Sequence, residues 1–429
     1  MGKQGEKYHW EIGSTPPDLD EHSQTKHKIS AAYLSRYIDT YFQKVMIEKL
    51  DLHLVDGFAG GGKYIDPDNG SLVDGSPFLA LNTLEEAVVR VNIDRKKPRA
   101  IKSNFHFIEK RSKNSAYLLN ELHNSQFKSR LGSSIHCHNA AFNDVLPNIV
   151  KHIKQQNPRT QRTIFLLDQY AYKDVPMESL AYIFRELSDP EVILTFNFDA
   201  LQRYLSDRPN NRTAIRNINL EEHISWERLQ EWKDAGKWHS MIQEQLAAGI
   251  KAATGAHHMT LFFIKGKTKG NKLTSYWLVH LSKRYIARDV MMQIHWDHAN
   301  DKMEFSHHLN EGFFQLGYQA YRKPKQDCFD IAECKVLSDS TRLKCIEKLS
   351  VEIPKLIADE LGPITYRSLL DQYGSYTPGS SNEIKAALQT AIDHKEIEVT
   401  GAKGERRKSS KSIENEATLD FSRQFGLFK

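Results

Sequence analysis

Residues 51–64 read DLHLVDGFAGGGKY, and this stretch decides the fold of the chain. An apolar run at residues 52–55 ends in Asp56, and glycine follows at positions 57, 60, 61 and 62. The pattern predicts a first strand, a tight turn and then a helix, because glycine permits sharp turns and close approach of a ligand to the backbone. Lys63 precedes Tyr64 rather than Ser or Thr, so the loop is not a P-loop. A tight strand–helix turn that binds nothing is the alternative.

The composition is that of an ordinary globular protein. The 429 residues are 40% hydrophobic and 26% charged, with a net charge of +5, which is compatible with a nucleic-acid partner without requiring one. The chain is long enough for two or three domains. Its four cysteines form no C-x-x-C pair, so a zinc or cluster site is the weaker reading, and sparse cysteine suits a reducing cytoplasm.

No segment of the sequence indicates a membrane or export. No apolar stretch approaches the roughly 18 residues that a membrane-spanning helix needs. The polar residues 1–24 lack the apolar core of a signal peptide. We therefore expect a cytoplasmic protein without a membrane partner.

Strands alternate with helices along the first three quarters of the chain, which predicts a Rossmann-like α/β fold with a mostly parallel sheet. The predicted strands cover residues 51–56, 104–109, 134–139, 162–169, 191–198, 259–264 and 275–281. The predicted helices cover residues 26–48, 112–124, 144–155, 176–187 and 285–296, and another opens at Ser76-Pro77, a good helix start.

Changes in composition and in the pattern of predicted elements divide the chain into three parts. Residues 1–48 are expected to form an N-terminal arm and helix, and residues 49–335 the Rossmann-like domain, with a helical insertion at about 201–256. Residues 336–429 contain the order helix, turn, helix, strand, basic tip and returning strand, which suits a winged helix.

The spacing Asp56-x-Phe58-x-Gly60-x-Gly62 resembles motif I of class I S-adenosylmethionine (SAM) methyltransferases, in the version used by DNA cytosine-C5 methyltransferases. Sheets of these enzymes usually end with a parallel sixth strand and an antiparallel seventh. The resemblance implies that SAM is the cofactor and that the glycine loop holds its amino-acid end. The expected contacts are Asp56, Gly57, Phe58, Ala59, Gly60 and Gly62.

Two further segments would complete a SAM site. Glu109 closes the second strand, where a carboxylate can accept hydrogen bonds from both ribose hydroxyls; a surface charge is the alternative. Asn139 and Ala140 follow the third strand, where adenine would lie, although Asn139 is as well explained as a turn residue. Asp56 and Glu109 lie further apart in sequence than the roughly 20 residues of the compact dinucleotide fingerprint.

The fourth strand ends in LLDQYAYKD, where many methyltransferases orient the methyl acceptor. Asp168 is the first candidate base, and Tyr170, Tyr172 and Lys173 supply aromatic and cationic groups that could hold a flipped base. The alternative is that the tyrosines pack the edge of the sheet. No Pro-Cys follows this strand, which disfavours a cysteine nucleophile.

Two basic segments could bind phosphates. The first follows the predicted sixth strand and contains Lys265, Lys267, Lys269 and Lys272, although a solvated hairpin tip explains it as well. The second is the tip of the C-terminal hairpin, where a single Glu405 accompanies Lys403, Arg406, Arg407, Lys408 and Lys411. A winged helix that contacts protein is the alternative for this second segment.

Over much of residues 22–297 the chain is similar to the three-Cys-motif partner (TcmP) family. The similarity rests on His22 with Lys26–Ile29 as K-x-K-x-I, on VDGFAGGGKY, on Gly75-Ser76-Pro77 and FIEK, and most specifically on SYWLVHLSKRYIARDVM at 275–291. It implies a bacterial methyltransferase-like protein with a radical-SAM-like partner encoded beside it. Relatives usually carry a D-P-x-G-like sequence where this chain has Asp168-Gln169-Tyr170-Ala171.

Together these features predict a SAM-dependent methyltransferase that acts on a nucleic acid or a nucleic-acid-associated substrate, in bacterial defence or mobile-element biology. The alternative is a catalytically degenerate methyltransferase fold that binds nucleic acid or a partner protein. A third, weaker hypothesis is that the cleft at the predicted SAM site binds another nucleotide, or catalyses a reaction on a base or on a phosphodiester.

Overall fold

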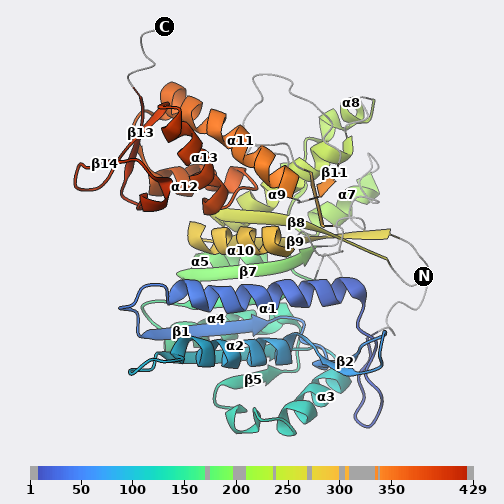
Figure 1. Ribbon diagram of the computed structural model, residues 1–429. Helices are drawn as coiled ribbons and strands as arrows, with labels where there is room; N and C mark the ends of the chain where they lie inside the picture. Colours follow the sequence, from blue (N-terminus) through green and yellow to red (C-terminus); the bar gives the residue numbers. More distant parts are fainter. Residues whose placement is uncertain are drawn as a thin grey trace. The chain divides into compact units, whose positions relative to one another are not determined.

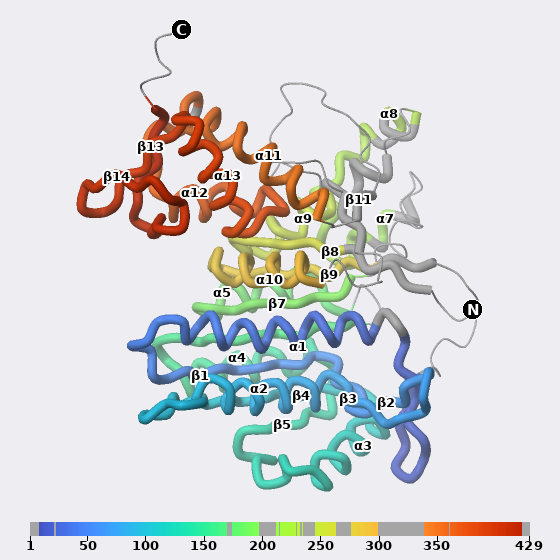
Figure 2. The backbone as a smooth tube through the Cα atoms, in the orientation of Figure 1, coloured from blue at the N-terminus to red at the C-terminus, as the bar shows by residue number. Residues whose placement is uncertain are grey.

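The computed structural model describes residues 8–169, 174–196, 209–234, 238–267, 273–298, 305–308, 334–336 and 339–422 (Figure 2). The chain divides into two compact units. The first comprises Met1–Glu222, Ile250–Ala256 and Phe263–Lys283, and the second comprises His223–Gly249, His257–Phe262 and Arg284–Lys429. The predicted domain boundaries at residues 48 and 335 stay predictions.

The first unit is built on a mostly parallel sheet, as predicted (Figure 1). Five neighbouring strands run parallel, and the antiparallel strand β9 (Leu273–Ser282) pairs with the last of them. The five are β5 (Ile135–His138), β4 (Ala100–Ile108), β1 (Lys49–Asp56), β6 (Arg162–Leu167) and β7 (Asp189–Phe196), in spatial order. Strand β8 (His258–Lys267) lies beyond β9, and its residues 263–267 belong to this unit. Within the described residues these strands form the mostly parallel α/β sheet that the sequence predicted, with one antiparallel strand beside β7.

The strands form because their residues are apolar on both faces, as a sheet covered on both sides requires. Leu52, Leu54 and Val55 of β1 are at most 1% exposed. The register places Asp56 beside Phe107 of β4 and Leu166 of β6. The carboxyl ends of these three strands therefore meet at one edge of the sheet.

Helices cover both faces of the sheet. In Figure 1, α1 (Glu21–Tyr41) and α2 (Ser76–Asn92) lie in front of the sheet, and α4 (Phe142–Gln156) and α5 (Met177–Glu186) lie behind it. Helix α3 (Ser112–His123) follows β4. Pro77 occupies the first turn of α2, as predicted. Helix α1 was expected over residues 26–48, but it begins at Glu21 and ends at Tyr41, before a turn that buries Phe42.

A small hairpin separates the glycine loop from α2. It consists of β2 (Lys63–Ile65) and β3 (Leu72–Asp74), and the sequence analysis did not predict it. Leu19 donates its backbone N–H to Ile65 O at 2.8 Å, so the N-terminal arm runs along this hairpin.

A buried polar group anchors α1 to the sheet. The hydroxyl of Tyr33 donates to Glu191 Oε2 on β7, and His280 Nε2 on β9 lies 3.1 Å from the same hydroxyl. Burial, followed by the charge of Glu191, raises the pKa of Tyr33 well above its ordinary value. Because Ile29 and Tyr33 are also fully buried, α1 cannot slide along the sheet without breaking these contacts.

The described residues between β7 and β8 are largely helical. They contain α7 (Pro209–Arg216), α8 (Leu229–Asp234) and α9 (Trp238–Thr254). None of the helices in the described ranges is both long and apolar enough to cross a membrane.

The C-terminal part of the second unit has the predicted order of elements. Helices α11 (Asp339–Leu356), α12 (Tyr366–Tyr373) and α13 (Ser381–Asp393) precede the hairpin strands β13 (Ile397–Thr400) and β15 (Thr418–Phe421). The short strands β12 (Ile364–Thr365) and β14 (Arg406–Arg407) complete a sheet of order β12-β15-β13-β14. Ser380 and Glu383 form a capping box at the start of α13.

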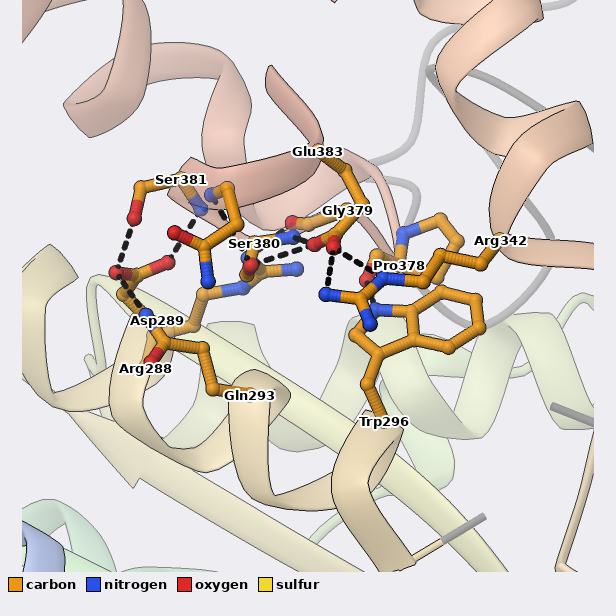
Figure 3. A network of polar contacts seen from close by, with 11 residues as sticks. Arg288, Asp289, Gln293, Trp296, Arg342, Pro378, Gly379, Ser380, Ser381 and Glu383 are labelled. Carbon is orange, nitrogen blue, oxygen red and sulfur yellow. Dashed lines mark hydrogen bonds and ion pairs between the residues drawn. The ribbon is translucent and has the colours of Figure 1, made fainter. Parts of the chain in front are cut away.

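The loop before α13 is fastened to α10 (Tyr285–His298) by buried polar contacts (Figure 3). Arg288 donates to the carbonyls of Thr377 and Gly379, the latter at 2.6 Å. Asp289 accepts from the backbone N–H and the hydroxyl of Ser381, both at 2.6 Å. These contacts bind α10 to the C-terminal helices within one unit.

Candidate active site

The structure brings four predicted residues to one edge of the sheet. Asp56 ends β1, Glu109 follows β4, Asn139 follows β5 and Asp168 follows β6. Strands β6, β1, β4 and β5 are consecutive neighbours and run parallel. Polar side chains from four chain segments therefore gather at the carboxyl edge, where α/β sheets bind ligands.

Asp56 is a buried carboxyl group in a negative environment. It is 2% exposed, and it accepts from Ser76 Oγ at 2.6 Å and from the N–H of Phe58 at 3.1 Å. Burial raises its pKa to about 7, and the charges of Asp168 and Glu109 act in the same direction against the two hydrogen bonds. Asp56 is therefore partly protonated near neutral pH.

The start of the glycine loop continues the pairing of the sheet. Gly57 donates its N–H to Leu166 O at 2.9 Å, and Ala59 donates to Ile108 O at 3.0 Å. Together with the bond from Phe58 to Asp56, these contacts occupy the first three N–H groups of the loop. A ligand at this loop would therefore meet the Asp56 side chain and the backbone from Gly60 onward.

The glycines are needed for two different physical reasons. Gly60 and Gly62 have φ values of +59° and +79°, in the left-handed region that favours glycine. A Cβ atom at Gly57 would lie 2.7 Å from Leu167 Cδ2, and one at Gly61 would lie 2.2 Å from Cγ of Trp10. The first pair of positions requires an unusual backbone, and the second pair lacks space for a side chain.

Trp10 of the N-terminal arm covers the glycine loop, which the sequence analysis did not predict. Its ring packs on Gly60 and Gly61, and its Nε1 donates to Lys63 O at 2.5 Å. Its backbone N–H donates to Asn114 Oδ1 at 3.2 Å. The arm is thus part of the wall around this loop.

Tyr64 lies close both to the aromatic side chains of the N-terminal arm and to the carboxylates at the edge of the sheet. The centroid of its ring lies 5.1 Å from that of Trp10 and 6.4 Å from that of Tyr8, both in edge-to-face arrangements. Burial raises the pKa of Tyr64 well above its ordinary value, and the charges of Asp168, Asp56 and Glu109 add to the shift. The hydroxyl of Tyr64 therefore stays neutral among carboxylates.

The surroundings of Asp168 lower its pKa, whereas those of Asp56 raise its pKa. Lys26 Nζ lies 2.7 Å from its Oδ1 and 2.6 Å from its Oδ2. Burial acts to raise the pKa of Asp168, but the charge and hydrogen bonds of Lys26, with a hydrogen bond from Thr195, outweigh it and lower the pKa. Asp168 is therefore an anion at neutral pH.

The remaining predicted cofactor residues lie on the other side of Asp56. Glu109 Oε1 accepts the N–H of Arg111 at 2.7 Å, and Asn139 Nδ2 donates to the carbonyl oxygen of Glu109 at 3.0 Å. Asn139 is exposed, and Ala140 is half-buried before α4. The side chain of Asn139 thus ties the ends of β4 and β5 together.

Several predicted residues cannot be placed at this edge. Tyr170, Tyr172 and Lys173 lie outside the described residues, as do Lys269 and Lys272. Lys265 and Lys267 belong to β8, and their side chains are not among those described.

The basic tip of the C-terminal hairpin is more neutral than its sequence indicates. Arg406 contacts Glu398 at 3.1 Å, and Arg407 contacts Glu405 at 2.5 Å and Glu414 at 3.8 Å. The sequence analysis counted Glu405 alone. Three further cations of the tip are exposed, namely Lys403, Lys408 and Lys411.

The side chains that sequence reasoning missed come from segments outside the strand ends. Lys26 belongs to the K-x-K-x-I segment and Ser76 to Gly75-Ser76-Pro77, so both stood in quoted motifs, but no role was assigned to them. Among the described residues, no group of three or more His, Cys, Asp or Glu side chains is arranged to hold a metal ion.

No family model and no curated protein matches this chain. Among solved structures, Trm1 from Pyrococcus horikoshii with S-adenosyl-L-methionine aligns with 96% of this chain and 94% of its own, at 10% identity and a TM-score of 0.34. A putative SAM-dependent methyltransferase from Methanococcus maripaludis aligns with 63% of this chain and 97% of its own, at 11% identity and a TM-score of 0.25.

A spermidine synthase in complex with a transition-state analogue also aligns with 62% of this chain, at 10% identity and a TM-score of 0.27. The match spans 60% of the spermidine synthase chain. TM-scores this low do not establish a common fold.

Proposed function

We propose that this chain is a SAM-dependent methyltransferase. The observation that carries the proposal is that buried Asp56 shares one edge of the sheet with Glu109 and Asp168. Burial, together with the charges of these two other carboxylates, raises the pKa of Asp56 to about 7. Carboxylates that repel one another favour a cationic ligand, which would lower this repulsion. SAM carries a sulfonium and an ammonium group and meets that requirement.

The residues fit the separate parts of SAM. Asp56 would face its ammonium group, Gly60 and Gly62 would let its amino-acid end approach the backbone, and Glu109 would accept from its ribose hydroxyls. Asn139 and Ala140 stand where adenine would lie. When bound, SAM supplies an electrophilic methyl group, and Asp168 would hold the acceptor toward it.

Equilibrium dialysis with three ligands tests the proposal. SAM and S-adenosylhomocysteine should both bind, because both carry the ammonium group that Asp56 would face and the ribose hydroxyls that Glu109 would hold. ATP should not compete, because its phosphates would face the same carboxylates. Preference for ATP, or no binding of SAM by folded protein, would contradict the cationic-site proposal.

We further propose that the acceptor is a nucleic acid. The order of α11, β12, α12, α13, β13 and β15 supports a winged helix, and the exposed Lys403, Lys408 and Lys411 support phosphate contacts at its tip. Replacing these three lysines by alanine should weaken binding to duplex DNA or RNA and reduce its salt dependence. Arg406→Ala is the matched control, because Glu398 already neutralises that charge.

The TcmP resemblance is also part of the proposal. It supports a bacterial source and a radical-SAM-like partner. A cytoplasmic location, which the sparse cysteines support, and a role in defence or mobile elements are also proposals. Affinity purification of the full chain from its own cells would test the partner.

A second candidate function is recognition without catalysis. The bidentate contact of Lys26 with Asp168 favours it, because the only placed candidate base is already paired. In that case Asp168→Asn would leave the biological activity of the protein unchanged.

A further inference from the structure

The ion pair between Lys26 and Asp168 is unevenly buried. The side chain of Lys26 is 10% exposed, whereas that of Asp168 is 44% exposed. Both carboxylate oxygens lie within 2.7 Å of the same Nζ. The lysine therefore holds the carboxylate from the protein side, and part of the carboxylate stays accessible.

Lys26 is held in place by the helix that carries it. Tyr33, about two turns further along α1, is anchored to Glu191 and close to His280. Nζ of Lys26 also lies 5.7 Å from the centroid of the Tyr276 ring on β9. A lysine fixed at both its backbone and its ammonium group gives Asp168 one orientation.

The pKa values of the two carboxyl groups at the ends of β1 and β6 are therefore shifted in opposite directions. Burial raises the pKa of Asp56 to about 7, and the charges of Glu109 and Asp168 add to that rise. Lys26 outweighs burial at Asp168 and lowers its pKa. Opposite shifts in neighbouring carboxyl groups mark different chemical tasks.

We propose that Lys26 is a positioning residue that fixes the Asp168 carboxylate as a hydrogen-bond acceptor, and that the methyl acceptor is therefore an amino nitrogen bearing N–H. The proposal rests on the proposed methyltransferase function and names the acceptor class of the same site. Of the four lone-pair positions of the Asp168 carboxylate, two face Lys26 and one accepts from Thr195, so one is left to accept from an N–H group.

The chemistry follows from the weak basicity of a lysine-paired carboxylate. A hydroxyl acceptor needs a base strong enough to take its proton as transfer proceeds. The lone pair of an amino nitrogen on a base is delocalised into the ring, and a hydrogen bond from its N–H to a carboxylate makes that lone pair more available without full proton removal. The nitrogen lone pair forms the N–C bond to the methyl carbon as the C–S bond breaks. The electron pair of that bond goes to sulfur, giving the neutral thioether, and the surplus N–H proton passes to water.

The test measures transfer of label from [methyl-3H]SAM to poly(A), poly(C) and poly(U). Poly(A) and poly(C) carry exocyclic amines and poly(U) does not, while all three carry ribose hydroxyls. We expect label in poly(A) or poly(C) and none in poly(U). Equal labelling of poly(U), or no labelling of any polymer by protein that binds SAM, would overturn the amino-acceptor inference and leave the cofactor proposal standing. Failure to bind SAM would overturn both.

Variants of Lys26 separate positioning from a structural role. Lys26→Met should lower kcat about 100-fold with an unchanged Kd for SAM, as expected for a misplaced orienting group. It should also move the acidic limb of the pH–rate profile upward, because Asp168 loses the cation that lowers its pKa. Lys26→Arg should keep most of the activity.

Lys28→Met is the matched control, since Lys28 is exposed on the same helix. Thermal unfolding of all three variants checks that α1 stays docked. A folded Lys26→Met protein with wild-type kcat and an unshifted pH–rate profile would overturn the positioning role.

Discussion

Ser76 Oγ donates to Asp56 Oδ2 at 2.6 Å, so the first residue of α2 holds the last residue of β1. This bond and the one from the Phe58 N–H act to lower the pKa of Asp56, while burial and two neighbouring carboxylates raise it to about 7. The group is therefore poised to lose its proton when a cation binds.

The first prediction concerns the pH dependence of SAM binding. A bound cation favours the Asp56 carboxylate, so binding should release a proton, and affinity should increase as the pH rises from about 5.5 to about 7. Calorimetry in buffers of different ionisation enthalpy measures this release. Asp56→Asn should abolish the pH dependence, and an affinity independent of pH in the wild type would refute the prediction.

The second prediction concerns the contact between Gly61 and Trp10. Gly61→Ala would place a methyl group 2.2 Å from the indole ring and should destabilise the protein by about 1–3 kcal/mol, as overpacking does. In a Trp10→Ala background the same substitution should cost little, because the collision is gone. Urea unfolding of the four proteins in this double-mutant cycle measures the coupling. Additive costs would show that the arm does not lie on the loop.

The strand ends were predictable because each strand is a local apolar run closed by a charged or polar residue. Asp56 and Asp168 end such runs, and parallel pairing then brings them to one edge without further information. The partner of Asp168 was not predictable in the same way. Lys26 is 142 residues away in sequence, and no local pattern specifies that pair.

The same reasoning explains what was missed at the loop and at the basic tip. Trp10 lies in a polar arm without periodicity, so nothing in the sequence indicates that it packs on glycine. Glu398 comes close to Arg406 because strands β13 and β14 pair, and Glu414 reaches Arg407 from the segment that precedes β15. Charge counted along the sequence therefore overestimated the charge of that surface.

Five histidines share one side of the sheet, on β1, β4 and β5 and on the facing helix α4. The rings of His106 and His136 are 5.0 Å apart, those of His106 and His152 are 5.4 Å apart, and His106 Nδ1 lies 3.2 Å from His138 Nε2. Burial lowers the pKa of His53 to about 4 and that of His106 to about 2, and neighbouring imidazoles add to both shifts.

The third prediction is a loss of stability in mild acid. An unfolded imidazole binds a proton below a pKa of about 6.5, whereas buried His53 and His106 stay neutral to much lower pH. Their contribution to the free energy of unfolding is therefore complete above about pH 6.5. As the pH falls this free energy decreases, by roughly 2 kcal/mol per group at about pH 5. Urea unfolding near pH 7 and pH 5 measures it.

Two variants sharpen this experiment. His106→Phe should reduce the pH dependence, because the most strongly shifted imidazole is removed. His123→Gln should leave it unchanged, since that side chain is exposed. Equal stability of the wild type at both pH values would contradict the assignment.

The fourth prediction concerns Arg288, which is 0% exposed and donates to the carbonyls of Thr377 and Gly379. Arg288→Leu leaves two buried carbonyls without their donor and should cost about 3 kcal/mol or more. Arg367→Ala should cost below about 1 kcal/mol, because its contact with Glu416 is 3.8 Å long and both side chains are 61% exposed. Chemical unfolding of the full chain compares them, and similar losses would contradict the role of Arg288.

The most direct test of the central claim is a calorimetric titration of SAM into the wild-type protein and into Asp56→Asn and Glu109→Gln. Glu48→Gln serves as the control, because Glu48 pairs with Lys97 just before β1 begins. The account predicts binding with a Kd of roughly 1–100 μM, weakened at least tenfold in the first two variants and unchanged in the control. No heat of binding in folded wild type, or equal affinity in all four proteins, would contradict a SAM site at this edge of the sheet.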